Sequence, residues 1–313
     1  MTAAARDHGG GLDAARDRWG GDDWLDLSTG IAPVPYPLPA LPDRAWTALP
    51  DRDAAAALVD AARAAWRVPD AAAILAAPGA SALIARLPAL AGPPGRVDIP
   101  GPTYNEHAAA FRAAGWSVAD DPGTGRVRVL VHPNNPDGRL WTAGDADAPF
   151  AVIDESFCDV TPAASLVALA TRPGRVILNS FGKFWGLAGL RLGFAIGHPD
   201  TIAPLAEALG PWPVSGPALA IGTQALNDRA WADAARARYA RDAARLDALM
   251  ARHGRLAGGT DLFRLHDVGD AAALRDRLAR HQIWTRAFPW SHSLIRLGLP
   301  PPDGWDRLEA ALA

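Results

Sequence analysis

The sequence predicts an α/β fold built around a mostly parallel sheet. Short apolar runs rich in Val, Ile and Leu alternate along the chain with longer Ala-rich segments of helical periodicity, which is typical of repeated strand and helix units. Polar or glycine residues follow several of these runs, at the carboxyl ends of the expected strands. Ligands of parallel sheets bind beyond these ends. At 313 residues and 49% hydrophobic, the chain is long enough for a large core split into two domains.

The expected elements follow one another along the chain. Residues 53–66 have a helical pattern, residues 72–77 a strand pattern, and a second helix is expected over residues 81–90, after Gly79. Further apolar runs predict strands at residues 96–99, 127–133, 150–156, 175–180 and 191–197, and Arg/Ala-rich helices continue through residue 254. A compact α+β tail follows, with strands at 261–267 and 293–299 and a helix at 304–313.

This order predicts two domains. The alternating strands and helices over residues 38–210 form a large domain. The change of pattern after residue 210 marks a small domain over residues 211–313. The first 30 residues carry too few apolar positions to fold alone, so we expect residues 1–37 to pack with the C-terminal part.

Composition excludes several classes of protein. The 31 basic residues are interspersed with 34 acidic ones, for a net charge of −3, which argues against electrostatic binding of nucleic acid. The one cysteine, Cys158, excludes an internal disulfide framework, and no histidine or cysteine spacing suits a metal. No apolar stretch is long enough for a membrane span, and the N-terminus is too charged for a secretory signal. We expect a cytoplasmic protein without metal, membrane or nucleic-acid partners.

Lys183 is the only lysine, because 30 of the 31 basic residues are arginine. An exposed salt bridge would accept either residue type. Arginine keeps its proton at any working pH, whereas a lysine amine can lose its proton and attack a carbonyl group to form a Schiff base. A solvated lysine in this position is the simpler alternative, so the residues around Lys183 in the fold decide between the two.

Four features accompany Lys183. Asp154 follows the apolar run of the strand pattern at 150–156, and Asn135 lies in a tight turn, "HPNNPDG", at the end of the strand pattern at 127–133. The segment "PGAS" around Gly79 is a strand-to-helix turn whose N–H groups suit an anion. Arg191 follows Lys183 by eight residues across a Gly-rich turn. Taken singly, each feature also suits an ordinary turn or cap.

Together these features resemble the aspartate-aminotransferase superfamily of pyridoxal-phosphate enzymes, known as fold type I. The matching motifs run in order along nearly the whole chain: "PGAS", "PTY" ending at Tyr104, "NNPDG", "VIDE", "SFGK" with Arg191 eight residues on, and "LIRLG" near the C-terminus. The resemblance implies a large domain with a mostly parallel seven-stranded sheet, a smaller α+β domain, pyridoxal 5'-phosphate as cofactor, and a homodimer.

The resemblance also implies roles for individual residues. Lys183 would hold the cofactor and move protons at Cα, Asp154 would pair with the pyridinium nitrogen, and Asn135 would bind the ring oxygen. Tyr104 would stack on the ring face, so the catalytic set is Lys183, Asp154 and Tyr104. The cofactor phosphate would lie at Gly79, Ala80, Ser81, Ser180 and Arg191.

The N-terminal segment resembles a particular subfamily. "HGGG" followed by "WLDLSTGIAPVP" is similar to the opening of the L-threonine-O-3-phosphate decarboxylases of cobalamin biosynthesis, which are close relatives of histidinol-phosphate aminotransferases. This resemblance implies a phosphorylated amino acid as substrate. Arg296 would bind its carboxylate as a fork, Arg286 and His8 its phosphate, and Ser28 belongs to the segment that covers it.

Three departures from the superfamily pattern favour the decarboxylase branch. Phe157 stands where many aminotransferases carry a tyrosine, Leu49 stands where relatives have a tyrosine that reaches a neighbouring subunit, and Gly182 replaces a Ser or Thr.

Other functions fit the sequence less well. An aminotransferase acting on a phosphorylated amine such as histidinol phosphate is the alternative within the fold. A non-catalytic regulator would need an attached DNA-binding domain, and Lys183 and Asp154 also count against it. A dehydrogenase would need a G-x-G-x-x-G turn, and an esterase with an "HGGG" loop would need a G-x-S-x-G elbow; the sequence has neither.

Overall fold

The computed structural model describes residues 8–121, 123 and 125–313. By its contacts the chain divides into two compact units. The sheet unit comprises Pro35–Asp233, and the terminal unit comprises the segment up to Val34 together with Ala234–Ala313. The boundaries at residues 37 and 210 proposed from the sequence stay a prediction about separately folding domains.

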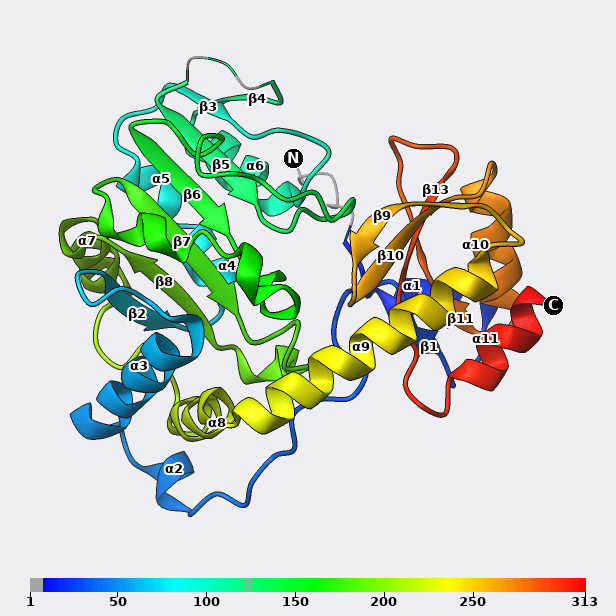
Figure 1. The fold of residues 1–313 in the computed structure, drawn as a ribbon, viewed down its shortest axis with the longest axis horizontal. Coiled ribbons are helices and arrows are strands. Elements are labelled where there is room, and N and C mark those ends of the chain that lie inside the picture. Colours follow the sequence, from blue (N-terminus) through cyan, green and yellow to red (C-terminus); the bar gives the residue numbers. More distant parts are fainter. Residues whose placement is uncertain (1–7, 122, 124) are drawn as a thin grey trace. The chain divides into compact units, whose positions relative to one another are not determined.

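The sheet unit contains a seven-stranded sheet in the order β2-β8-β7-β6-β5-β3-β4 (Figure 1). Only β8 runs antiparallel to its neighbours; the other pairings are parallel. This confirms the predicted α/β class with a mostly parallel seven-stranded sheet. The strands are β2 (Ala73–Ala77), β3 (Arg96–Asp98), β4 (Ser117–Ala119), β5 (Val127–Val131), β6 (Phe150–Asp154), β7 (Arg175–Ser180) and β8 (Gly193–Gly197).

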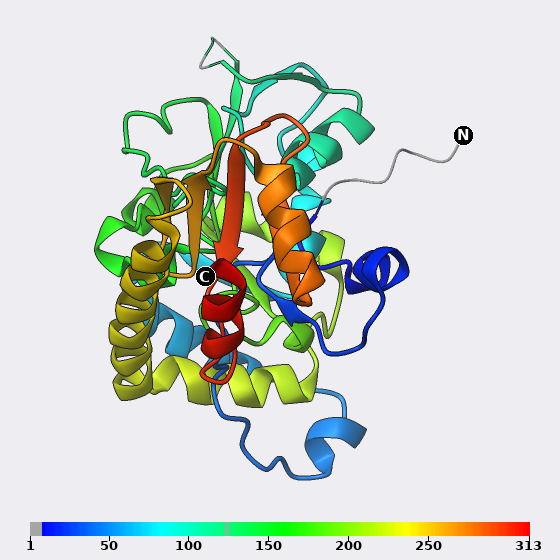
Figure 2. The ribbon, with the colours of Figure 1, turned by 90° about the vertical axis from the view of Figure 1, so that its right-hand side faces the viewer.

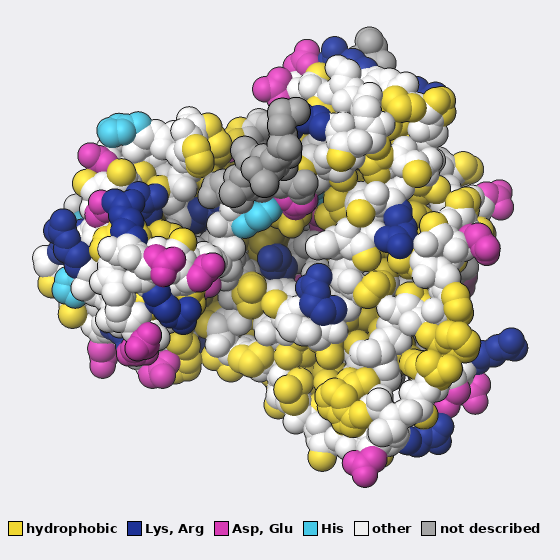
Figure 3. Space-filling model, turned by 180° about the vertical axis from the view of Figure 1, so that it is seen from behind, with side chains coloured by type: hydrophobic (Ala, Val, Ile, Leu, Met, Phe, Trp, Pro, Cys, Tyr) yellow, Lys and Arg dark blue, Asp and Glu magenta, His cyan; other side chains and the backbone are white. Residues whose placement is uncertain are grey.

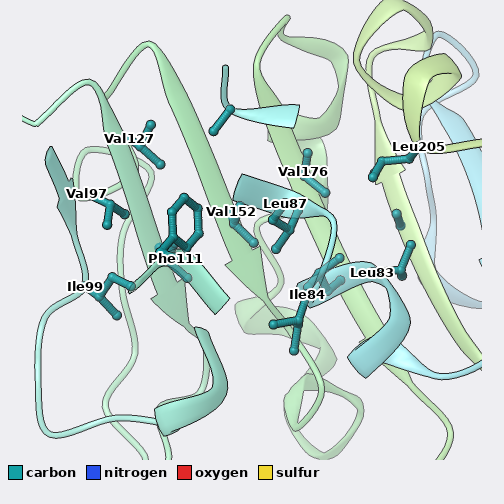
Figure 4. Close-up of a cluster of buried hydrophobic side chains, with 14 of the residues drawn as sticks. Leu83, Ile84, Leu87, Val97, Ile99, Phe111, Val127, Val152, Val176 and Leu205 are labelled. Carbon is teal, nitrogen blue, oxygen red and sulfur yellow. The ribbon is translucent and has the colours of Figure 1, made fainter. Parts of the chain in front are cut away.

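Both faces of this sheet are buried, which explains why its central strands are continuous apolar runs. On one face Val152 and Val176 pack with Phe111 and Leu83 from covering helices (Figure 4). On the other face Ile153 and its neighbours form a second cluster of buried side chains. Polar residues at the strand ends therefore stand out as candidates for function.

The helices of the sheet unit follow the predicted alternation. The helix expected at 53–66 is α3, and α8 packs against it. The prediction of a single helix at 81–90 is wrong, because this segment contains two short helices, α4 and α5. Pro88 in the first turn of α5 has no N–H to donate to the carbonyl of Ile84, so one continuous helix cannot form. The helices are α2 (Arg44–Thr47), α3 (Arg52–Trp66), α4 (Ala80–Ile84), α5 (Leu87–Leu90), α6 (Asn105–Ala113), α7 (Pro199–Leu209), α8 (Gly216–Asn227) and α9 (Arg229–Met250), which continues into the terminal unit.

The terminal unit joins both ends of the chain. Its antiparallel sheet has the order β12-β13-β10-β9 and includes both predicted C-terminal strands, and β1 pairs in parallel with β11, with Leu25 opposite Ile283. In Figure 2 the helix α10 lies alongside β13. The elements are β1 (Leu25–Asp26), β9 (Arg255–Thr260), β10 (Phe263–Asp267), β11 (Ile283–Trp284), β12 (Arg286–Ala287), β13 (Leu294–Gly298), α1 (Leu12–Trp19), α10 (Ala271–Arg280) and α11 (Trp305–Leu312). Among the described residues, no helix has the length and apolar character to cross a membrane.

Candidate active site

A cavity of about 220 Å³ opens beside the carboxyl ends of β5, β6 and β7 in the sheet unit. Ligands of open parallel sheets bind at such an edge. The cavity gathers residues that lie more than 100 positions apart in the sequence, and eight of them were predicted as cofactor-binding. These eight are Lys183, Asp154, Asn135, Tyr104, Ala80, Ser81, Ser180 and Arg191.

Lys183 lies in the turn that follows β7, and its flanking aromatic residues fix this turn. Phe181, Phe184 and Trp185 are buried, and the Trp185 indole donates a hydrogen bond to the Asp159 carboxylate at 3.2 Å. Buried side chains on both sides of the lysine thus set the path of its backbone. The Lys183 amine lies over the Phe157 ring, 5.5 Å from its centroid, so this ring forms one wall of the cavity beside the amine.

Asp154 ends β6, and both of its carboxylate oxygens accept hydrogen bonds. Oδ2 lies 2.7 Å from Nε2 of His107, while Oδ1 accepts from the backbone N–H of Ser156 at 3.0 Å and from its hydroxyl at 2.5 Å. Burial alone would raise the pKa of Asp154, but the His107 and Ser156 contacts outweigh burial and lower it. The carboxylate therefore stays charged at neutral pH.

His107 is the main site residue that was not predicted from the sequence. It is fully buried and lies three residues after Tyr104, at the start of α6. Its ring is 6.0 Å from that of Tyr104, since residues i and i+3 share a helix face. The Tyr-x-x-His spacing was readable from the sequence, but its partner Asp154 is 47 positions away.

A second network brings Tyr104 and Asn135 to the same cavity. The side chain of Asn134 donates to the carbonyl of Pro102 at 3.0 Å and accepts from the hydroxyl of Thr103 at 2.6 Å. The buried Asn134 thereby ties the "PTY" segment to the "NNPDG" turn. This explains why neighbouring asparagines have different tasks: Asn134 holds the turn together, while Asn135 lines the cavity.

Two glycines shape the part of the cavity that was predicted to bind phosphate. Gly79 has a φ of 84°, and a Cβ there would lie 2.5 Å from Nη2 of Arg191. A Cβ on Gly193 would lie 2.4 Å from the backbone nitrogen of Ala80. Glycine at both positions therefore lets the turn before α4 lie against β8 and the Arg191 guanidinium. With the hydroxyls of Ser81 and Ser180 in the same wall, the donor set suits a phosphate dianion.

A neighbouring cluster, His132, Glu155 and Cys158, has ligand atoms within 4.8 Å of one another but lacks a free histidine nitrogen. Nδ1 of His132 accepts from the N–H of Trp141 at 3.0 Å, and Nε2 lies 2.8 Å from the carbonyl of Ala164. Burial lowers the pKa of His132 and raises that of the Cys158 thiol. Both groups are therefore neutral, and the cluster is a packed part of the interior.

Burial of Glu155 predicts how the stability of the protein depends on pH. Its carboxylate accepts from the hydroxyl of Ser165 at 2.7 Å and the N–H of Leu166 at 2.6 Å. Burial raises the pKa of Glu155 to about 7, and these bonds offset only part of the effect. The native state thus binds this proton up to about pH 7, while the unfolded chain releases it near its ordinary pKa of about 4.3. Stability contributed by Glu155 therefore falls as pH rises between these values.

We expect Glu155→Gln to remove this dependence. Thermal unfolding measured from pH 5 to pH 8 should show the variant gaining stability relative to the unsubstituted protein as pH rises from 5 to about 7, with the difference levelling off above that pH. A difference between the two proteins that does not change with pH would contradict the raised pKa.

The substrate-binding residues predicted from the sequence belong to the terminal unit, whereas the residues that line this cavity belong to the sheet unit. Arg296 is buried, its Nη2 donates to the carbonyl of Ser28 at 2.7 Å, and its guanidinium lies 5.1 Å from the centroid of the Phe263 ring. Arg286 is opposite Arg296 in the pairing of β12 with β13. The structure thus brings Ser28, Arg286 and Arg296 together, and His8 is exposed.

Comparison with known proteins places these residues in a family. The chain is 43% identical to the threonine-phosphate decarboxylase of Pseudomonas aeruginosa, covering 98% of this chain and 97% of that protein. It is 42% identical to the threonine-phosphate decarboxylase of a Sinorhizobium species over the same shares. The chain belongs to the threonine-phosphate decarboxylase family. The family model for aminotransferase class I and II matches residues 119–261, so the superfamily inferred from the motifs is confirmed.

Solved structures of the fold agree with this membership. The histidinol-phosphate aminotransferase of Sinorhizobium meliloti, in complex with pyridoxal-5'-phosphate, has a TM-score of 0.84 at 20% identity and covers 96% of this chain and 93% of its own. The L-threonine-O-3-phosphate decarboxylase of Porphyromonas gingivalis has a TM-score of 0.71 at 22% identity, covering 91% and 97%. At these identities the likeness concerns the fold.

The cavity fits pyridoxal 5'-phosphate, the cofactor of this family. It offers a charged carboxylate for a ring nitrogen at Asp154, an amine for an aldehyde at Lys183, and an aromatic side chain at Tyr104. The turn at Gly79 and the Arg191 guanidinium suit the cofactor phosphate, and a Cβ at Gly79 would collide with that guanidinium. The individual contacts with the cofactor stay predictions.

Proposed function

We propose that this protein catalyses the pyridoxal-phosphate-dependent decarboxylation of L-threonine O-3-phosphate to (R)-1-aminopropan-2-ol O-phosphate, a carbon–carbon lyase step of cobalamin biosynthesis. The observation that carries the proposal is 43% identity to a threonine-phosphate decarboxylase over nearly the full length of both chains. The cavity adds the chemistry, since Lys183 and Asp154 line it together.

Four of the residues that line the cavity have proposed tasks in this reaction. When bound, the cofactor accepts the electron pair that the departing carboxylate leaves at Cα. Asp154, held charged by His107 and Ser156, stabilises a proton on the ring nitrogen and so increases the ring's capacity for electrons. Lys183 would bind the cofactor aldehyde and would be the proton donor to Cα. Tyr104 would pack on the ring, and Asn135 would bind its oxygen.

Which bond breaks at Cα depends on how the substrate is held. Decarboxylation would require the residues that bind the substrate to direct the bond between Cα and the carboxylate toward the π system that the cofactor would supply. We propose that the phosphate of the substrate is bound by Arg286 and His8 and its carboxylate by Arg296, the roles predicted from the sequence. Arg286 and Arg296 are neighbours across paired strands, so the two guanidinium groups suit a substrate with two anionic ends.

The test is release of carbon dioxide from carboxyl-labelled L-threonine O-3-phosphate by the purified protein with added cofactor. We expect release equimolar with aminopropanol phosphate. Transfer of the amino group to 2-oxoglutarate without release would instead establish the alternative, an aminotransferase acting on a phosphorylated amine. The histidinol-phosphate aminotransferase of Symbiobacterium thermophilum supports that alternative only as a relative, at 32% identity over 44% of this chain.

We also propose that the protein is a homodimer joined through the sheet unit. Leu38, Trp46, Leu49 and Trp212 are each more than half exposed. An apolar groove of about 400 Å³ lies among α2, α3 and α8, and Figure 3 shows hydrophobic side chains gathered on the lower part of the molecule, where Figure 1 places these helices. Apolar patches of this kind mark interfaces.

Light scattering tests the dimer. Trp46→Arg should shift the protein toward the monomer, whereas Trp290→Arg, at a comparably exposed tryptophan of the terminal unit, should not. Equal behaviour of the two variants would count against this face.

We also propose a cytoplasmic location. The one cysteine is buried and forms no disulfide, which suits a reducing compartment. Fractionation of cells tests this location.

A further inference from the structure

The three glycines of the "HGGG" motif have a structural role in the terminal unit. Gly9, Gly10 and Gly11 connect His8 to the start of α1. A Cβ on Gly9 would lie 2.5 Å from the carbonyl oxygen of Ser28, while Gly10 and Gly11 have φ values of 87° and 70°. Each glycine is therefore required for a different local reason: Gly9 for close approach, and the next two for backbone conformation.

Two side chains hold both backbone groups of Gly10. Its N–H donates to the hydroxyl of Ser28 at 2.7 Å, and its carbonyl accepts from the indole Nε1 of Trp284 at 2.7 Å. Ser28 and Trp284 lie 256 positions apart, at the two ends of the terminal unit. Asp26 pairs with Trp284 in the short ribbon of β1 and β11, which fixes the two anchors relative to each other.

The hydrogen bonds of Ser28 define what its hydroxyl can do. Its Oγ donates to Oδ1 of Asp26 at 2.6 Å, and its backbone N–H donates to the same oxygen at 2.8 Å. A hydroxyl has one proton, and here that proton is already given to Asp26. Ser28 is also 1% exposed. Its hydroxyl is therefore placed to accept from Gly10 and not to donate to an anionic substrate.

The anchors also connect to Arg296 and to α1. Nη2 of Arg296 donates to the carbonyl of Ser28 at 2.7 Å, so the same residue holds a predicted substrate ligand and the glycine turn. The Trp284 ring lies 5.5 Å from that of Trp19 at the end of α1 and 6.2 Å from that of Trp24. One tryptophan thus contacts both ends of the segment from Gly10 to Trp19.

We propose that Ser28 and Trp284 are positioning residues that form a clasp on Gly10 and thereby hold the His8–Gly11 segment and the Arg296 guanidinium in place. Ser28 thus acts through these neighbours and does not touch the substrate. The catalytic consequence rests on the proposed function, whereas the clasp itself does not.

Hydrogen exchange of the Gly10 amide in the cofactor-loaded protein without substrate tests the clasp. Ser28→Ala and Trp284→Phe should each increase the exchange rate about tenfold, since each removes one hydrogen bond, and Ser28→Thr should restore protection. Trp24→Phe is the matched control: it removes an indole N–H of the same aromatic group, but that N–H donates to Gly20 and Gly21, so exchange at Gly10 should not change.

Kinetics with L-threonine O-3-phosphate then separate positioning from direct binding. We expect Ser28→Ala and Trp284→Phe to raise KM several-fold with little change in kcat, and Ser28→Thr to recover KM. Unchanged exchange at Gly10 in both variants would overturn the clasp whatever the kinetics. A KM raised in Ser28→Ala with exchange unaltered would make Ser28 a direct ligand, which also overturns it. If the unsubstituted protein releases no carbon dioxide, the proposed function fails, and the exchange result alone decides the clasp.

Discussion

Replacement of Lys183 by arginine is expected to reduce decarboxylation by about 10³-fold or more while leaving the fold intact. Arginine preserves the positive charge and the length of the side chain, but its guanidinium does not lose a proton at working pH and cannot attack the cofactor aldehyde. The side chain lies in a cavity with space beside the Phe157 ring, so arginine should be accommodated.

Two measurements check this expectation. The variant should lose the absorbance that covalently bound cofactor gives at the short-wavelength edge of the visible range. Its thermal unfolding temperature should change little. Arg191→Lys is the contrasting variant: it weakens the predicted phosphate contact yet keeps the amine of Lys183, so it should retain that absorbance at saturating cofactor. Turnover of Lys183→Arg at the rate of the unsubstituted protein would refute the role of the lysine.

Asp154→Asn is expected to lower the rate by about 10² to 10³-fold, the cost of removing one group that stabilises developing charge in a buried site. Asparagine has the same shape, but it carries no charge to hold a proton on the ring nitrogen. Because the His107 and Ser156 contacts keep the pKa of Asp154 below its ordinary value, this carboxylate should not titrate in the pH–rate profile at neutral pH.

The control is the adjacent Glu155→Gln, in which a buried carboxylate that does not line the cavity is neutralised. Its rate should remain near that of the unsubstituted protein, since Glu155 binds Ser165 and Leu166. Covalent cofactor should still be detected in Asp154→Asn, because Lys183 is intact. Equal rates for Asp154→Asn and the unsubstituted protein would remove Asp154 from the catalytic set.

Some parts of the fold and site were predictable because their cause is local. The apolar runs at 150–156 and 175–180 identified β6 and β7 because both faces of those strands are buried. The helix break at Pro88 was also readable in principle, since proline lacks the required N–H. The short strands β1, β11 and β12 were not, because two-residue strands carry no periodic signal.

The sequence by itself determined the α/β class, the unique lysine and the order of motifs that indicates a pyridoxal-phosphate enzyme, because each depends on residue type and short spacing. Only the tertiary structure decided which side chains share their hydrogen bonds. His107 reaches Asp154 across 47 positions, and Ser28 and Trp284 meet on Gly10 from opposite ends of the chain. The physical reason is that a hydroxyl or imidazole has few hydrogen-bonding positions, and packing of distant segments determines which partners occupy them.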